Sequence, residues 1–205
     1  MLTVTDLQAR RGRRVLFSCL ALAAGPGQLL RVAGANGAGK TTLLRMLVGL
    51  TAPAAGEVRW RGRPIAAQRD TFHRELVYIG HAAALKDDLS ALENLRMLAA
   101  LGGDEVSPAE AAVALAAAGL KGRERLPARV LSAGQRRRVV LARLALGGPQ
   151  ALWVLDEPFN ALDVEAAQWL AARVCAQLAA GGVVVLTSHQ PLPLDGAVEP
   201  VTVTL

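Results

Sequence analysis

The residues of this sequence best suited to chemistry form a glycine-rich run that ends in a lysine and two threonines. They are Gly34, Ala35, Asn36, Gly37, Ala38, Gly39, Lys40, Thr41 and Thr42, with the spacing Gly-x4-Gly-Lys-Thr. Glycines let the main chain turn tightly and bring its N–H groups against a polyphosphate with no Cβ in the way. In this spacing the lysine reaches the β- and γ-phosphates and the next hydroxyl binds Mg2+. The run, called the phosphate loop below, therefore predicts a nucleoside triphosphate site.

The segments on either side of the phosphate loop have the patterns of a buried strand and a helix. Residues 28–33 before it are mostly apolar, and residues 41–48 after it continue as a helix. A phosphate-binding loop requires this strand-loop-helix context. The helix N-terminus adds N–H donors and a partial positive charge that favour an anion. Sequence context and spacing thus agree.

Two adjacent carboxylates follow a second apolar strand, which we predict over residues 152–155. Asp156 is expected to be the second protein ligand of Mg2+ beside Thr41. Glu157 is placed to orient or deprotonate a water that attacks the γ-phosphate. His189 follows another buried strand, at 183–187, and is placed to touch the γ-phosphate. The predicted chemistry is phosphoryl transfer to water, although the carboxylates could also be a solvated strand end.

A helix start is predicted at Ser132, because Ser132, Ala133, Gly134 and Gln135 have the spacing of a capping box. Its hydroxyl and N–H groups could also receive an anion. Taken alone, this segment, called the signature segment below, is an ordinary helix start. Asp163 is predicted to cap a further helix over residues 164–180.

Composition limits the class of protein. The net charge of +6 could meet nucleic acid, an anionic membrane face or an acidic partner. The aromatic content of 3% disfavours stacking platforms for single-stranded nucleic acid. No apolar run approaches the roughly 18 residues that a spanning helix needs, and the N-terminus lacks the layout of a signal peptide, so we expect a cytosolic chain. Cys19 and Cys175 are expected to be reduced packing residues.

The order of elements indicates an α/β core interrupted by a helical insertion. Short strands are predicted at 2–7, 15–22, 57–60 and 76–79, and capping boxes at Ser90 and Ser107 open two helices of the insertion. Apolar strands without alternation suit a parallel sheet that is covered on both faces.

Taken together, these pieces resemble the ATP-binding-cassette (ABC) ATPases, because the LSAGQ run at residues 131–135 is close to that family's LSGGQ signature. The resemblance implies a P-loop fold with a mostly parallel core sheet and an N-terminal antiparallel β subdomain. It divides the chain into a nucleotide-binding core, residues 1–80 and 147–205, and a helical subdomain, residues 81–146. It also implies ATP and Mg2+ as ligands and a head-to-tail homodimer. In that dimer the signature segment closes over the partner's ATP, and Asp163 belongs to the loop at the interface.

Two positions depart from the family pattern. An aromatic residue that stacks on adenine is usual, but Arg10, Arg11 and Arg13 stand there, so base stacking is weak or comes from a guanidinium. The usual glutamine before the helical region is missing, and His81 follows the strand at 76–79. A neutral imidazole is a poorer ligand for Mg2+ than an amide oxygen, so we expect His81 to position water or sense the partner.

Residues 78–81, 85–86 and 89–95 are similar to one branch of the family, the ATP-binding subunits of bacterial haem export and cytochrome c maturation systems. This similarity implies peripheral docking on membrane permease subunits at the cytoplasmic face of the inner membrane. Hydrolysis would then energise haem export or release of a haem-loaded chaperone. The alternatives are the ATPase of another small ABC transporter and a soluble ABC ATPase acting on nucleic acid. A P-loop GTPase is disfavoured because no Asn-Lys-x-Asp sequence is present.

Overall fold

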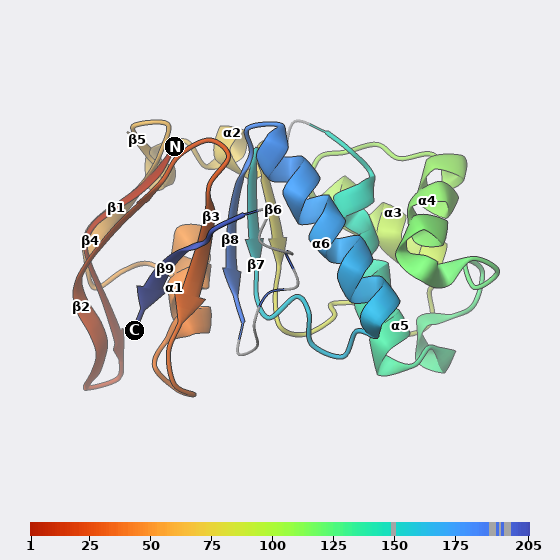
Figure 1. The fold of residues 1–205 in the computed structure, drawn as a ribbon, viewed down its shortest axis with the longest axis horizontal. Helices are drawn as coiled ribbons and strands as arrows, with labels where there is room; N and C mark the ends of the chain where they lie inside the picture. Colours follow the sequence, from red (N-terminus) through yellow and green to blue (C-terminus); the bar gives the residue numbers. More distant parts are fainter. Residues whose placement is uncertain (149–150, 189–191, 193, 195–197) are drawn as a thin grey trace.

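Two β-sheets and a group of helices build the fold (Figure 1). In the computed structural model, residues 1–148, 151–188, 192, 194 and 198–205 are described. The larger sheet has five parallel strands in the order β6-β7-β8-β3-β9. The strands are β3 (Leu29–Ala33), β6 (Leu76–Ile79), β7 (Leu152–Leu155), β8 (Val183–Thr187) and β9 (Val201–Thr204). The predicted α/β fold with a mostly parallel core sheet is therefore confirmed.

Both faces of this sheet are apolar, which explains the absence of alternation in its strands. On β7, Leu152 and Val154 face one cluster, while Trp153 and Leu155 face another. The first face packs against α1 (Lys40–Leu47), and the second packs against α6 (Val164–Ala179) and α5 (Ala133–Leu141). Figure 1 shows α6 lying across the sheet.

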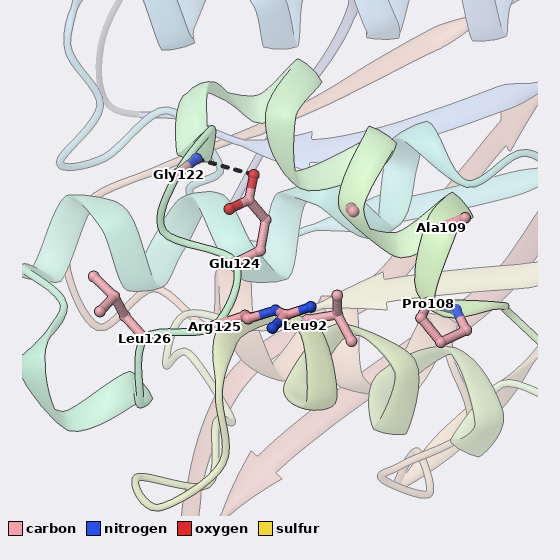
Figure 2. A pocket seen from close by; sticks show the side chains of 8 residues that line it. Leu92, Pro108, Ala109, Gly122, Glu124, Arg125 and Leu126 are labelled. Carbon is pink, nitrogen blue, oxygen red and sulfur yellow. Dashed lines mark hydrogen bonds between the residues drawn. The ribbon is translucent and has the colours of Figure 1, made fainter.

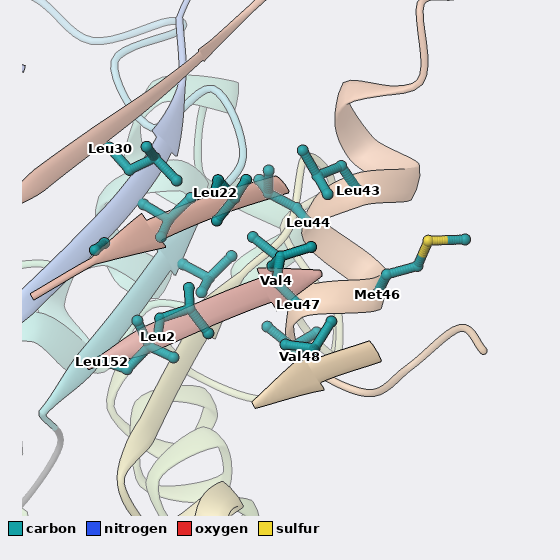
Figure 3. Close-up of a cluster of buried hydrophobic side chains, with 14 of the residues drawn as sticks. Leu2, Val4, Leu22, Leu30, Leu43, Leu44, Met46, Leu47, Val48 and Leu152 are labelled. Atoms are coloured by element: carbon teal, nitrogen blue, oxygen red, sulfur yellow. The ribbon is translucent and has the colours of Figure 1, made fainter. Parts of the chain in front are cut away.

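The smaller sheet is antiparallel, in the order β2-β1-β4-β5. Its strands are β1 (Leu2–Arg11), β2 (Arg14–Ala24), β4 (Ala55–Trp60) and β5 (Arg63–Pro64). Apolar side chains of β1 and β2 pack against α1, as Figure 3 shows for Leu2, Val4 and Leu22 with Leu43, Leu44 and Leu47. The antiparallel sheet and the parallel sheet thus share one core through α1, and this core fixes the start of α1.

The helical insertion has its own apolar cluster, formed by α3 (Ala91–Leu101), α4 (Pro108–Leu115) and α5. The predicted capping boxes are present at Ser90, Ser107 and Ser132. The helical run of α4 continues as η2 (Ala116–Leu120), in which Gly119 has φ +77°. The shorter helical segments are η1 (Ile65–Ala67), α2 (Arg69–Arg74), η3 (Ala128–Val130) and η4 (Ala142–Ala145). No helix of the described residues has the length and apolar content to cross a bilayer.

Several boundaries differ from the sequence prediction. β1 extends past residue 7 to Arg11, because bulges let it keep pairing with β2 as far as the arginine-rich turn, and β2 runs from Arg14 to Ala24. β5, α2 and β9 were not predicted. The expectation that Cys19 packs in the core is wrong: it lies exposed on β2, at a bulge where its φ is +53°. It is a free thiol, as is the half-buried Cys175.

Candidate functional site

The phosphate loop leaves the carboxyl end of β3 and enters α1. Gly34, Gly37 and Gly39 have φ values of +146°, +80° and +110°, a region that residues with a Cβ rarely adopt. The loop is also crowded: a Cβ on Gly34 would lie 3.0 Å from the carbonyl of Leu205. These glycines therefore let the main chain curl closely around the space where a polyphosphate would sit.

Lys40, the first residue of α1, is folded back over this loop. Its Nζ donates to the carbonyls of Gly34 (2.8 Å) and Ala35 (3.1 Å), and the side chain is almost wholly buried. An ammonium group has three donors, so the loop occupies two and one can point at a ligand. Lys40 is thus a cation held in place by the carbonyls of the phosphate loop.

Asp156 directly follows β7 and is 1% exposed. Its Oδ2 accepts from the hydroxyl of Thr41 at 2.8 Å, and its Oδ1 accepts from the hydroxyl of Thr187 at 2.7 Å. The Thr187 oxygen in turn accepts from the N–H of Glu157 at 2.7 Å. Both carboxylate oxygens of Asp156 are therefore fixed, and the hydroxyl of Thr41 touches the oxygen that faces the loop.

Glu157 has a strained main chain, with φ +48°. Its Oε2 accepts from the side-chain amide of Asn160 and lies 3.7 Å from Nδ1 of His81. A cavity of about 330 Å3 joins Glu157 and His81 to the phosphate loop. Its lining consists of Arg11, Leu16, Asn36, Gly37, Gly39, Lys40, Thr41, Thr42, His81 and Glu157. A carboxylate thus lines the same cavity as the phosphate loop, an arrangement that allows it to orient a water beside a phosphate.

Comparison with known proteins decides the family. A model of the ABC transporter family matches residues 18–160. The chain belongs to this family. It is 55% identical over 205 residues, all of this chain and 95% of the relative, to the cytochrome c biogenesis ATP-binding export protein CcmA of Aromatoleum aromaticum. It is 52% identical over 195 residues to the protein of the same name from Methylococcus capsulatus, covering 95% of this chain and 94% of that one.

Solved structures of ABC transporter proteins have the same fold. An ATP-binding protein from Pyrococcus furiosus superposes with a TM-score of 0.83 at 24% identity, covering 100% of this chain and 96% of that one. The ATP-binding cassette MJ0796, described as a dimer bound to ADP and Pi, gives 0.78 at 22% identity, covering 93% and 88%. At these identities the likeness establishes the fold, and that fold agrees with the sequence prediction.

In this ABC chain, no residue of the signature segment lines the cavity of the phosphate loop. The segment begins α5, where the Ser132 hydroxyl accepts from the N–H of Gln135 at 3.2 Å. Ala133 lines a second cavity of about 330 Å3, whose lining shares Glu157 and His81 with that of the phosphate-loop cavity. A Cβ on Gly134 would lie 2.8 Å from the carbonyl of Ala161, so this contact requires glycine.

The remaining predicted site residues are Asp163, the arginines expected near the base, and His189. Asp163 caps α6 by accepting from the N–H of Ala166 at 3.0 Å, as predicted, and also pairs with Arg138. Of the arginines expected near the base, Arg11 is among the residues that line the phosphate-loop cavity, whereas Arg10 and Arg13 are not. His189 lies outside the described residues.

The sequence analysis missed three residues that contact this site. Thr187 ends β8 and lies beside Asp156 because Leu155 pairs with Leu186 in the parallel register. That adjacency could have been predicted from two neighbouring strands that both end in polar residues. Asn160 and Arg137 gave no such signal, since nothing local distinguishes them from their neighbours.

A cavity of about 450 Å3 lies apart from this site, between α3, α4 and the loop at residues 122–126 (Figure 2). It is lined by Leu92, Pro108, Ala109, Ala112, Gly122, Glu124, Arg125 and Leu126. None of the predicted site residues is in this lining, which is largely apolar and lacks a glycine loop. It is therefore not a second candidate for the nucleotide.

Proposed function

We propose that this chain is the ATP-binding and ATP-hydrolysing subunit of a membrane ABC complex that serves c-type cytochrome biogenesis. The observation that best supports this proposal is the chain of hydrogen bonds from Thr41 through Asp156 and Thr187 to Glu157. Glu157 and Lys40 line the same cavity. The relatives at 52% and 55% identity, named as export proteins of cytochrome c biogenesis, support the more specific role. In that role, hydrolysis energises haem export or the release of a haem-loaded chaperone.

In this proposal the phosphate loop binds ATP. The N–H groups of residues 34–42 cradle the phosphates, and Lys40 neutralises charge on the β- and γ-phosphates. The loop fits such a group, because Gly34, Gly37 and Gly39 have positive φ values that let its main chain turn tightly. Arg11 reaches the same cavity and supplies a guanidinium beside the base or ribose.

Thr41 and Asp156 are the residues that would hold Mg2+. Their oxygens lie 2.8 Å apart, and both are the hard oxygen donors that this ion prefers. The described residues contain no group of three or more His, Cys, Asp and Glu side chains suited to a metal. Two protein oxygens with phosphate and water completing the shell is the usual magnesium arrangement. When bound, Mg2+ would neutralise charge on the phosphates.

In hydrolysis, Glu157 orients or deprotonates the attacking water, and His189 touches the γ-phosphate. His81 lies 3.7 Å from the same carboxylate and is the neighbour that orients it or the water. Asn160 donates to the same oxygen of the carboxylate, Oε2. Glu157 is thus positioned before substrate arrives.

The working form of the subunit is a head-to-tail homodimer. The signature segment, Ser132 to Gln135, would close over the ATP of the partner, and Asp163 would lie at the interface. None of residues 132–135 lines the phosphate-loop cavity of its own chain, which supports this proposal. We assign the core to residues 1–80 and 147–205 and the helical subdomain, with its own apolar cluster, to residues 81–146.

The complex would sit at the bacterial inner membrane, with this subunit bound peripherally to permease subunits at the cytoplasmic face. The test is mild detergent extraction from the native membrane, capture of the tagged full chain and mass spectrometry, with a haem absorbance spectrum of the eluate. Recovery of cytochrome-maturation permease subunits supports the proposal. Recovery of permeases for another cargo would assign it to another small ABC transporter, and recovery of nucleic acid without permeases would assign it to the soluble class.

A further inference from the structure

A buried arginine connects the signature helix to both loops that carry the hydrolytic residues. Arg137 projects from α5 and is 6% exposed. Its Nη1 donates to the carbonyls of Gly80 (2.7 Å) and His81 (3.3 Å). Its Nη2 donates to the carbonyls of Asp156 (2.8 Å) and Glu157 (3.1 Å). One guanidinium therefore holds the main chain just after β6 and just after β7.

The neighbouring arginines of α5 have different partners. Arg136 pairs with Asp87 at 2.6 Å, and Arg138 pairs with Asp163. Successive residues of a helix point about 100° apart, so three adjacent arginines must leave α5 in three directions. Arg137 is the one of the three that points at the ends of the parallel strands.

The main chain held by Arg137 is strained. Glu157 has φ +48°, and such a conformation persists only where its surroundings over-determine it. Two contacts do so from opposite sides: Thr187 accepts from the N–H of Glu157, and Arg137 donates to its carbonyl. Without the guanidinium, the peptide after Glu157 is free to relax and to carry the carboxylate away from His81.

The shape of the guanidinium suits this role. A planar fork with donors on two nitrogens can span four carbonyls at once, which a lysine ammonium cannot do with the same geometry.

We propose that Arg137 is a positioning residue that sets the Glu157 carboxylate and the His81 ring against the phosphate-loop cavity, and that it links this arrangement to α5. The proposal rests on the proposed function, in which Glu157 acts on the attacking water. Because α5 begins with the signature segment, a shift of α5 when the partner's ATP is engaged reaches Glu157 through this guanidinium. Arg137 therefore affects turnover and does not affect capture of ATP.

The test compares Arg137→Gln and Arg137→Lys with wild type in the purified full chain. The readouts are the Kd for a fluorescent ATP analogue, kcat, KM for ATP and the urea midpoint. We expect Arg137→Gln to lower kcat about 100-fold with an unchanged Kd, the size of loss that a small misplacement of a reacting group produces. Arg137→Lys keeps the charge and loses the fork, so its kcat should lie between the two.

Arg173→Gln is the matched control. Like Arg137, Arg173 has a buried Nε without a hydrogen-bond partner among the described residues. Its Nη2 donates to the carbonyl of Leu144 at 3.0 Å, outside the site. The Arg173→Gln substitution should lower the urea midpoint and leave kcat unchanged. If Arg137→Gln does not fold, Arg137→Lys alone decides between the outcomes.

Wild-type kcat in the Arg137 variants, or a rise in Kd that equals the fall in kcat, would overturn the positioning role. Failure of the proposed function would look different: the wild-type chain would not hydrolyse ATP, or Glu157→Gln would hydrolyse it at the wild-type rate.

Discussion

Replacing Thr187 by valine tests the contact network of the site at a residue that the sequence analysis did not single out. Its hydroxyl donates to Oδ1 of Asp156 and accepts from the N–H of Glu157, both at 2.7 Å, and the residue is fully buried. Valine has nearly the same volume, so the change removes hydrogen bonds without opening a cavity.

The size of the effect follows from these two bonds. A hydrogen bond to a charged group contributes about 1.5–3 kcal/mol, and a buried N–H left without an acceptor costs about 1–3 kcal/mol. Asp156 keeps its bond from Thr41, so its charge is not left entirely unpaired. We therefore expect Thr187→Val to lower the free energy of unfolding by about 3–5 kcal/mol.

Urea unfolding of the full chain, followed by tryptophan fluorescence, measures this loss. Thr187→Ser is the control, because it keeps the hydroxyl and removes one methyl group, worth about 0.8 kcal/mol. The serine variant should retain magnesium-dependent ATP hydrolysis, and the valine variant should require more Mg2+ for half-maximal rate. Equal urea midpoints for the two variants would refute the reasoning.

Three further predictions use other parts of the site and fold. Lys40→Met should raise the Kd for ATP by about tenfold or more, since a charged hydrogen bond is worth about 1.5–3 kcal/mol, and an unchanged Kd in a fluorescent-nucleotide titration would exclude that role. Gly134→Ala places a Cβ 2.8 Å from the carbonyl of Ala161. It should weaken ATP-driven dimerisation in light scattering at unchanged ATP affinity, and normal dimers would contradict it. Glu110 accepts hydrogen bonds from the hydroxyl and from the main-chain N–H of Ser107, and these bonds lower its pKa, the hydroxyl bond more than the N–H bond. That contribution to stability is complete above the unfolded pKa and is lost as pH falls through the lowered folded value. Ser107→Ala should therefore lower the urea midpoint more at neutral pH than in acid, where only the cap bond from the N–H of Glu110 to the Ser107 hydroxyl is lost. An equal difference at both pH values would count against it.

Much of the fold follows from local sequence. The predicted strands at 76–79, 152–155 and 183–187 coincide with β6, β7 and β8, because each is a short apolar run with polar or glycine residues beside it. β1 is longer than predicted, since its arginines can point to solvent while their main chain stays paired. β9 is an exposed edge strand of four residues, and such a strand carries little apolar signal.

The site was predictable where its chemistry is local and unpredictable where it depends on packing. The phosphate loop is contiguous, so spacing alone locates Lys40 and Thr41. Thr187 contacts Asp156 across 31 residues of sequence, and the contact exists because β7 and β8 are neighbours in register. Arg137 lies between two other arginines, and only the orientation of α5 against the sheet distinguishes it from them.

The most direct test of the account is ATP binding and single-turnover hydrolysis by Glu157→Gln, measured in one preparation beside wild type. The account predicts an ATP Kd equal to that of wild type and a hydrolysis rate lower by about 100-fold or more, the usual contribution of a general base. Glu165→Gln, which removes an exposed carboxylate in the first turn of α6, is the control and should hydrolyse normally. Wild-type hydrolysis by Glu157→Gln would contradict the account.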